Sequence, residues 1–143
     1  MAEKPIANQT IVAVFAAGEN RTSLIDIFGR SKWKLQFTCT LLETQTALSL
    51  SPGVVISEVR SSDGHSWNDL LHEIQKMVCP PPLIVTDRLA DEQLWAEVLN
   101  LGAYDLLKTP LDAKEVLYAV STACRRTESD HEMAGLRKTA ASA

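Results

Sequence analysis

The stretch Pro52–Arg60, PGVVISEVR, decides how the rest of the chain is interpreted. Its centre, Val54–Ile56, is a continuous apolar run, typical of a strand buried on both faces of a parallel sheet. The run ends at Glu58, so this carboxylate is predicted to lie at the carboxyl tip of a buried strand. In open α/β sheets, binding sites are built at this edge, and we therefore look for function around Glu58.

The composition is that of one globular domain. The chain has 143 residues, 45% of them hydrophobic and 22% charged, which is enough to bury a core. A formal net charge of −4 argues against a nucleic-acid partner. The sequence shows neither an apolar run of about 18 residues for a membrane span nor an apolar signal core, so we expect a cytoplasmic protein without a membrane partner. Its three scattered cysteines are predicted to be free thiols.

Apolar periodicity predicts five strands that alternate with five helices. The strands are expected at residues 10–15, 33–40, 52–59, 83–86 and 104–107, and the helices at 19–30, 42–50, 67–77, 91–101 and 113–125. The second strand alternates apolar and polar side chains, which is typical of a strand at a sheet edge. Short connections with right-handed crossovers give one parallel sheet with helices on both faces, but they leave the strand order open.

Apolar stripes predict which helical side chains face the sheet. They are Leu24, Ile25 and Phe28; Ala47, Leu48 and Leu50; Trp67, Leu70, Leu71, Ile74 and Met77; Leu94, Trp95, Val98 and Leu101; and Val116, Leu117, Val120 and Cys124. Ser66 is predicted to cap the third helix, and Gly102 to end the fourth. Residues 1–9 are expected to form a tail, and residues 126–143 either a tail or an extension of the last helix.

Four segments, taken in chain order, carry a family resemblance. They are PGVVISEVRSSDGHSW at 52–67, LIVTDRLADE at 83–92, GAYDLLKTPLDAKEV at 102–116 and EVLYAVSTAC at 115–124. Together they resemble the receiver domains of two-component response regulators, and the similarity covers residues 10–125. The resemblance implies a flavodoxin-like (CheY-like) fold. This is a doubly wound, five-stranded parallel sheet of order 2-1-3-4-5 in three αβα layers, with its site between the first and third strands.

The resemblance also shows where this chain departs from the family's phosphorylation site. Receivers phosphorylate an Asp at the position of Glu58 and bind Mg²⁺ through an acidic pair at the positions of Phe15 and Ala16. Their Lys precedes the Pro of the last motif, where this chain has Thr109, and Lys108 stands one step earlier. In an extended chain, that one step turns Lys108 to the other face.

Three further positions complete the comparison with the family. The Thr or Ser that contacts phosphate at the end of the fourth strand is kept as Thr86. The next residue, Asp87, adds negative charge, and Leu106 replaces the family's switch aromatic. Phosphoryl transfer to a carboxylate brings two anions together and needs a divalent metal and a cation. We therefore predict a degenerate receiver that is not phosphorylated by the usual route and uses no metal or cofactor.

Glu58 has two interpretations. It either imitates a phosphorylated Asp, within reach of Thr86 or Lys108, or it is a solvated carboxylate left after the catalytic set was lost. A rebuilt metal site would have to draw on Glu58 and on Asp63, Asp87 or Glu19, which come from separate loops. Gly18 has no phosphate-loop motif around it and is interpreted as a turn glycine. The two histidines nearest the predicted site, His65 and His72, are interpreted as surface residues.

Interface candidates lie on the face formed by the fourth helix, fifth strand and fifth helix, which is the partner and dimer surface in receivers. They are Trp95, Tyr104 and Leu106, and aromatic side chains are favoured interface anchors. Trp95 also falls on the predicted core stripe, so a packing role is the first expectation for it.

The sequence leaves three functional hypotheses. The leading one is an atypical bacterial receiver that acts, without enzymatic activity, as a phosphorylation-independent interaction module. Its partner would be a histidine kinase, a phosphotransfer protein, an effector or a second copy. The second is a phospho-accepting receiver that uses Glu58 with a recruited metal. The third is a flavodoxin-like protein that binds a small molecule or nucleotide in a pocket beside Phe15.

Overall fold

One parallel sheet organises the part of the chain that the computed structural model describes, residues 10–29 and 31–142, with side chains as far as Ser129. Its strands are β1 (Thr10–Val14), β2 (Lys34–Thr38), β3 (Val54–Glu58), β4 (Leu83–Asp87) and β5 (Asp105–Lys108). The spatial order is β2-β1-β3-β4-β5, which confirms the order implied by the resemblance and the edge position of β2. The predicted tail of residues 1–9 lies outside the described residues.

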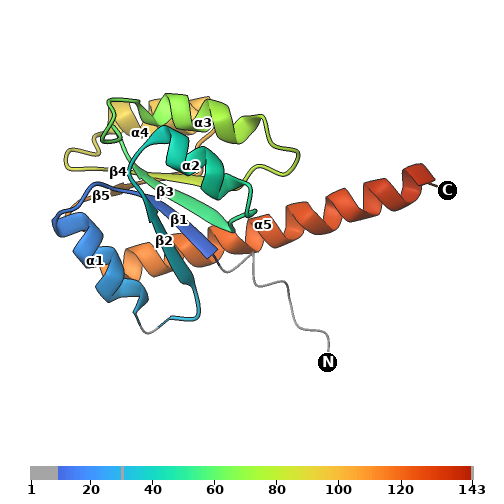
Figure 1. Ribbon diagram of the computed structural model, residues 1–143, viewed down its shortest axis with the longest axis horizontal. Helices are drawn as coiled ribbons and strands as arrows, with labels where there is room; N and C mark the ends of the chain where they lie inside the picture. Colours follow the sequence, from blue (N-terminus) through green and yellow to red (C-terminus); the bar gives the residue numbers. More distant parts are fainter. Residues whose placement is uncertain (1–9, 30, 143) are drawn as a thin grey trace.

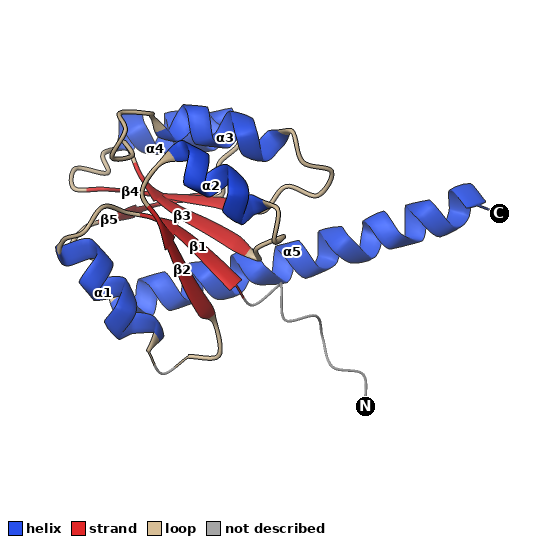
Figure 2. Cartoon of the chain, viewed as in Figure 1, coloured by secondary structure: helices blue, strands red, loops and turns tan. Residues whose placement is uncertain are grey.

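Helices cover both faces of the sheet and complete three layers (Figures 1 and 2). They are α1 (Glu19–Phe28), α2 (Leu41–Leu48), α3 (Trp67–Gln75), α4 (Glu92–Leu101) and α5 (Ala113–Ser142). α1 and α5 lie on one face, and α2, α3 and α4 lie on the other. None of the described helices combines the length and the hydropathy that crossing a bilayer would require.

The core has two halves because successive residues of a strand point to opposite faces. In β3, Val54 and Ile56 pack under α1 and α5, whereas Val55 packs under α2, α3 and α4. β1 alternates in the same way, with Ile11 on the first face and Val12 on the second. A central strand therefore needs apolar side chains on both faces, which accounts for the continuous run in PGVVISEVR.

Two helix ends follow the predicted capping residues, Ser66 and Gly102, and Asp91 forms a further cap that was not predicted. The backbone N–H of Ser66 donates to the carboxylate of Asp69 at the start of α3, 3.2 Å away. Asp91 caps α4 by accepting a hydrogen bond from the N–H of Leu94 at 2.8 Å. Gly102 ends α4 with φ of 113°, a left-handed conformation that glycine adopts without steric cost.

Four residues predicted to face the sheet are instead exposed, and one predicted on a wet face is buried. Ile25, Leu50, Trp95 and Leu101 are 47–57% exposed. α2 ends at Leu48, so Leu50 follows it. α4 contacts chiefly the edge strand β5, and Val98 is its one buried residue, which leaves the flanks of the predicted stripe in solvent. Thr38 is buried because its hydroxyl pairs with that of Thr44 on α2 at 2.7 Å.

The last helix continues past residue 125, so the extension that the sequence left open is helical as far as Ser142. At 30 residues it is about 45 Å long, and its end projects beyond the sheet (Figure 1). The packing of this helix against the core also extends beyond residue 125. Thr127 is 2% exposed and its hydroxyl donates to the carbonyl of Gly53, before β3, at 2.6 Å.

Candidate functional site

A cavity of about 520 Å³ opens at the carboxyl ends of β1, β3 and β5. Its lining residues come from four segments of the chain, namely Ala16, Ala17, Gly18, Glu19 and Asn20; Glu58; Arg88; and Thr109 and Pro110. A second cavity of about 370 Å³ shares Asn20, Glu58, Arg88 and Thr109 with it and extends to Val59, Arg60, Thr86 and Asp87. The site therefore lies at the switch point of the sheet, as the sequence predicted.

The N-terminus of α1 forms one wall of the first cavity. Gly18 occupies the N-cap position and no side chain caps the helix. The first backbone N–H groups of a helix have no intrahelical partner, and they carry the positive end of the helix dipole. This wall therefore presents backbone donors, although the adjacent Glu19 carboxylate opposes their positive potential.

The acidic and basic side chains on the cavity wall do not form ion pairs with one another. Glu58, at the half-buried tip of β3, and Arg88, in the loop after β4, line both cavities. Neither side chain forms an ion pair or side-chain hydrogen bond with any residue in the described part of the chain. Sequence reasoning missed Arg88, although its place directly after a buried strand was a usable signal.

Thr86 and Asp87 lie beside Glu58, but their polar groups are already engaged. The Thr86 hydroxyl, 2% exposed, donates to the carbonyl of Ser57 at 3.3 Å. The Asp87 carboxylate accepts from the N–H groups of Leu89 and Ala90, at 3.3 and 3.4 Å, and shapes the β4–α4 loop. The interpretation of Glu58 as a carboxylate held by Thr86 therefore gains no support from the hydrogen bonds.

Lys108 and Thr109 take opposite positions at the end of β5. Lys108 is exposed and lines neither cavity. Thr109 is 6% exposed and lines both. Neighbouring residues of a strand point to opposite faces, so the shift of the lysine by one position turns it away from the pocket. A hydroxyl therefore stands in the pocket where, by the resemblance, receivers place an ammonium group.

Phe15, which we predicted to lie beside the pocket, is buried in the core under α1 and α5 and is 1% exposed. The apolar wall of the cavity is made by Ala16, Ala17 and Pro110 instead. The prediction was wrong because β1 ends at Val14 and Phe15 continues its alternation by pointing to the α1 and α5 face, as Ile11 and Ala13 do.

The four carboxylates considered for a metal site do not come together. Glu19 and Glu58 line the cavity, Asp87 is engaged in its own loop, and Asp63 lies in a separate network. Among the described residues, no three or more His, Cys, Asp or Glu side chains are placed to hold a metal ion.

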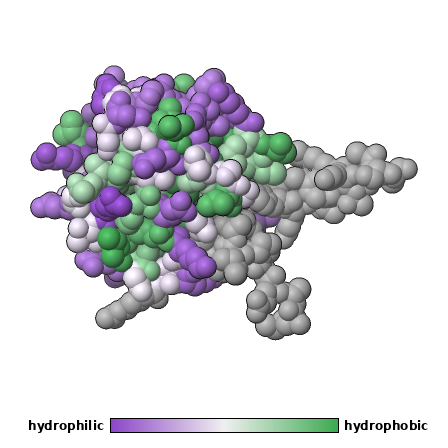
Figure 3. Space-filling view, viewed as in Figure 1, coloured by the Kyte–Doolittle hydropathy of each residue, from purple (hydrophilic) through white to green (hydrophobic). Residues whose placement is uncertain are grey.

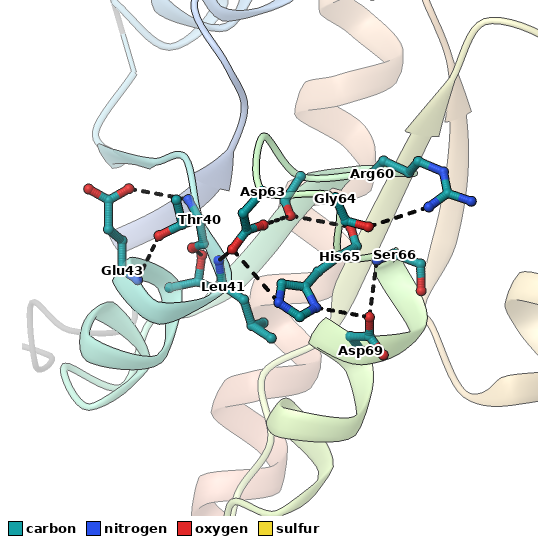
Figure 4. A network of polar contacts seen from close by, with 11 residues as sticks. Thr40, Leu41, Glu43, Arg60, Asp63, Gly64, His65, Ser66 and Asp69 are labelled. Atoms are coloured by element: carbon teal, nitrogen blue, oxygen red, sulfur yellow. Dashed lines mark hydrogen bonds and ion pairs between the residues drawn. The ribbon is translucent and has the colours of Figure 1, made fainter.

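The separate network ties the β3–α3 loop to the start of α2 (Figure 4). The Asp63 carboxylate accepts from the N–H of Leu41 at 3.2 Å and from the Ser61 hydroxyl. Chiefly because of the Ser61 hydroxyl, the pKa of Asp63 is lowered. His65 lies between Asp69, at 3.2 Å, and Asp63, at 3.9 Å, so it is a surface histidine with a local electrostatic role.

The three interface candidates differ in exposure. Trp95 is 50% exposed, whereas Leu106 is buried with the α2–α4 side of the core. Tyr104 is partly buried, with the Arg126 guanidinium 5.6 Å from its ring centre. Tyr118, on α5, is 70% exposed and was not among the candidates. Trp95 and Tyr118 are therefore the exposed aromatic residues that α4 and α5 offer to a partner.

The free cysteines agree with the sequence analysis, since Cys39, Cys79 and Cys124 form no disulfide. Burial raises the pKa of the Cys124 thiol to about 11.

The surface seen in Figure 3 mixes polar and hydrophobic side chains, with hydrophobic ones near α1 and β2. Ile25 contributes there, at 53% exposed, together with the partly buried Leu35 and Phe37.

Comparison with solved structures identifies the fold. The signal receiver domain of an HD domain-containing protein from Pseudomonas fluorescens Pf-5 is 22% identical, with a TM-score of 0.78 over 92% of this chain and 97% of that one. A two-component response regulator from Clostridium difficile is 22% identical, with a TM-score of 0.68 over 82% and 96%. The beryllofluoride-activated NtrC4 receiver domain dimer is 18% identical, with a TM-score of 0.70 over 84% and 98%.

The chain therefore has the flavodoxin-like fold of response regulator receiver domains. No protein-family model matches it, and no curated protein is recognisably similar to it in sequence.

Proposed function

We propose that this chain is an atypical receiver domain of two-component signalling that acts in the cytoplasm as a protein-interaction module and is not phosphorylated by the usual route. The observation that carries the proposal is the wall of the switch-point cavity. By the resemblance, Phe15 and Ala16 stand where receivers use carboxylates, and Thr109 stands where they use an ammonium group. Phe15 is buried in the core, and Ala16, the next residue Ala17 and Thr109 line the cavity, so methyl groups and a hydroxyl take the place of those charges.

The electrostatics of the cavity oppose phosphoryl transfer. Glu58 and Glu19 are both acidic, and among the described residues Arg88 is the one basic residue that lines the cavity. An incoming phosphodonor carries further negative charge, and without a divalent ion its repulsion by Glu58 is not offset. We infer that no enzymatic turnover takes place here and that the scaffold serves recognition.

The proposed partner surface is the face made by α4, β5 and α5. Trp95 and Tyr118 expose large aromatic side chains there, and such residues are enriched among interface anchors. The NtrC4 receiver, which shares the fold, is a dimer in its activated form. The proposed occupants are a histidine kinase, a phosphotransfer protein, an effector or a second copy of this chain.

Intact mass spectrometry after incubation with Mg²⁺ and acetyl phosphate tests the first half of the proposal. We expect the unmodified chain to gain no phosphoryl group and its tryptophan fluorescence not to respond to beryllofluoride. A variant with Ala16→Asp, Ala17→Asp and Glu58→Asp, which returns carboxylates to the cavity wall, is the matched control. A phosphoryl adduct on the unmodified chain would refute the proposal and favour a phospho-accepting role for Glu58.

Sedimentation velocity over a range of concentrations tests the second half for the case of a second copy. We expect self-association that Trp95→Ala weakens and that Leu42→Ala leaves unchanged. Leu42 is a suitable control because it is 73% exposed but lies on α2, on another part of the surface. Equal weakening by both changes, or persistence of the dimer in the Trp95 variant, would exclude this face as the dimer surface.

A further inference from the structure

We propose that the cavity beside Glu58 binds a small zwitterion, a free α-amino acid with a short aliphatic side chain, without a metal and without a covalent step. This site is independent of the proposed interaction face, and it gives a chemical identity to the small-molecule hypothesis. The inference starts from two opposite charges that share one cavity and do not pair with each other.

The charge balance of the cavity wall selects the class of ligand. The wall holds two carboxylates, Glu19 and Glu58, and one guanidinium, Arg88, so a simple anion meets net repulsion. A simple cation would pair with the carboxylates but leave the exposed Arg88 guanidinium without a partner. A ligand with an ammonium group at one end and a carboxylate at the other satisfies both kinds of charge, as electrostatic complementarity requires.

The carboxylate end of the ligand would lie between Arg88, Thr109 and the start of α1. Thr109 is 6% exposed, and its hydroxyl makes no hydrogen bond to a residue in the described ranges. No buried side-chain polar atom of the described residues lacks a partner, so this hydroxyl is not sealed inside the core. Because Thr109 lines the cavity, its hydroxyl is a donor that a ligand can reach. Gly18, Glu19 and Asn20, at the start of α1 where no side chain caps the helix, line the same cavity, and helix N-termini favour anions.

The ammonium end would lie against Glu58. This carboxylate is half-buried at the tip of β3 and has no side-chain partner among the described residues. Partial burial strengthens a charge-assisted hydrogen bond to an ammonium group, because less water competes for the carboxylate. The amide of Asn20 lines both cavities beside Glu58 and can accept a further ammonium hydrogen.

The size and apolar lining of the cavity limit the ligand further. A volume of about 520 Å³ falls in the range of small-molecule sites. Its apolar surface comes from Ala16, Ala17 and Pro110, which suits a short aliphatic group. No aromatic side chain of the described part of the chain lines it, and Phe15 is buried in the core, so a flavin or nucleobase would lack a stacking partner there.

Titration calorimetry with valine and two matched fragments tests the proposal. Isobutylamine lacks the carboxylate of valine, and isovalerate lacks its ammonium group. We expect saturable binding of valine and at least tenfold weaker binding of either fragment and of inorganic phosphate. Equal binding of valine and one fragment, tighter binding of phosphate, or no saturable binding of valine would overturn the proposal.

Variants locate the site and separate this test from that of the proposed function. Glu58→Gln, Arg88→Gln and Thr109→Val are each expected to weaken valine binding about tenfold or more, while Glu97→Gln, on the exposed face of α4, leaves it unchanged. Circular dichroism confirms folding of each variant. Unchanged binding in all three cavity variants would refute the assignment. Self-association through Trp95 and the absence of phosphorylation are separate readouts that valine binding does not affect.

Discussion

The buried hydroxyl of Thr127 makes the extension of α5 testable. It donates to the Gly53 carbonyl at 2.6 Å and to the Ala123 carbonyl at 3.2 Å. Thr127→Val keeps the shape of the side chain and its β-branching but removes the donor, so the buried Gly53 carbonyl loses this partner. The expected loss is about 1–2 kcal/mol of the free energy of unfolding, since a buried hydrogen bond contributes about 1 kcal/mol and an unmet polar group costs more. That corresponds to a fall of about 3–6 °C in Tm for a chain of this size.

Urea unfolding followed by tryptophan fluorescence measures the effect. Thr122→Val is the matched control, because the Thr122 hydroxyl bonds only to the carbonyl of Ala119 within the same helix, at 3.0 Å, and lies partly in solvent. We expect this control to change stability by less than about 0.5 kcal/mol. A chain truncated after Arg125 should lose at least as much stability as the Thr127 variant. If Thr127→Val matches its control, the segment beyond Arg125 contributes nothing to the packed core and the reasoning fails.

Three further predictions follow from single residues. Gly102→Ala should lower the free energy of unfolding by about 1–3 kcal/mol, because Gly102 has φ of 113° and a Cβ there would lie 2.9 Å from the Gln75 side chain. Gly102→Asn should lower it less in the same urea assay. Val98→Ala should lower the free energy of unfolding by roughly 2 kcal/mol, whereas Trp95→Ala should lower it by under about 0.5 kcal/mol. Similar losses for the two variants would contradict the exposure of Trp95. The pKa of Cys124 is raised by burial from 9.0 to about 11, so its contribution to stability is complete below pH 9 and is lost as pH rises towards 11. Rapid alkylation of the folded Cys124 at pH 8.5, at the rate of the two less buried cysteines, would contradict that shift.

Much of the fold could be predicted because buried parallel strands and amphipathic helices leave strong local patterns. The runs around Val12, Val55 and Val85 specified central strands, and the alternation around Leu35 specified an edge strand. The failures occurred where the local pattern was ambiguous. The stripe that included Trp95 was wider than the face that α4 buries, and periodicity alone does not report how far a helix overlaps a sheet.

Most residues predicted for the candidate site line one of the two cavities. They are Ala16, Glu58, Thr86, Asp87 and Thr109, whereas Phe15 and Lys108 line neither. Arg88 came from a loop whose path depends on the Asp87 carboxylate and on Ala90, which adopts φ of 39°. Such a loop has no periodic pattern to read, so its place directly after β4 was the only sequence signal for Arg88, and the direction of its side chain depends on the backbone.

The sequence by itself determined the alternation of strands and helices, the burial of the central strands and the lack of acidic residues at Phe15 and Ala16, where the family has its acidic pair. Those properties follow from the order of residue types along the chain, and they need no knowledge of long-range contacts. Only the tertiary structure decided which side chains share the cavity, that Glu58 and Arg88 stay unpaired there, and that Thr127 belongs to the core. These depend on segments far apart in the chain, whose relative positions are set by the packing of the whole sheet and its helices.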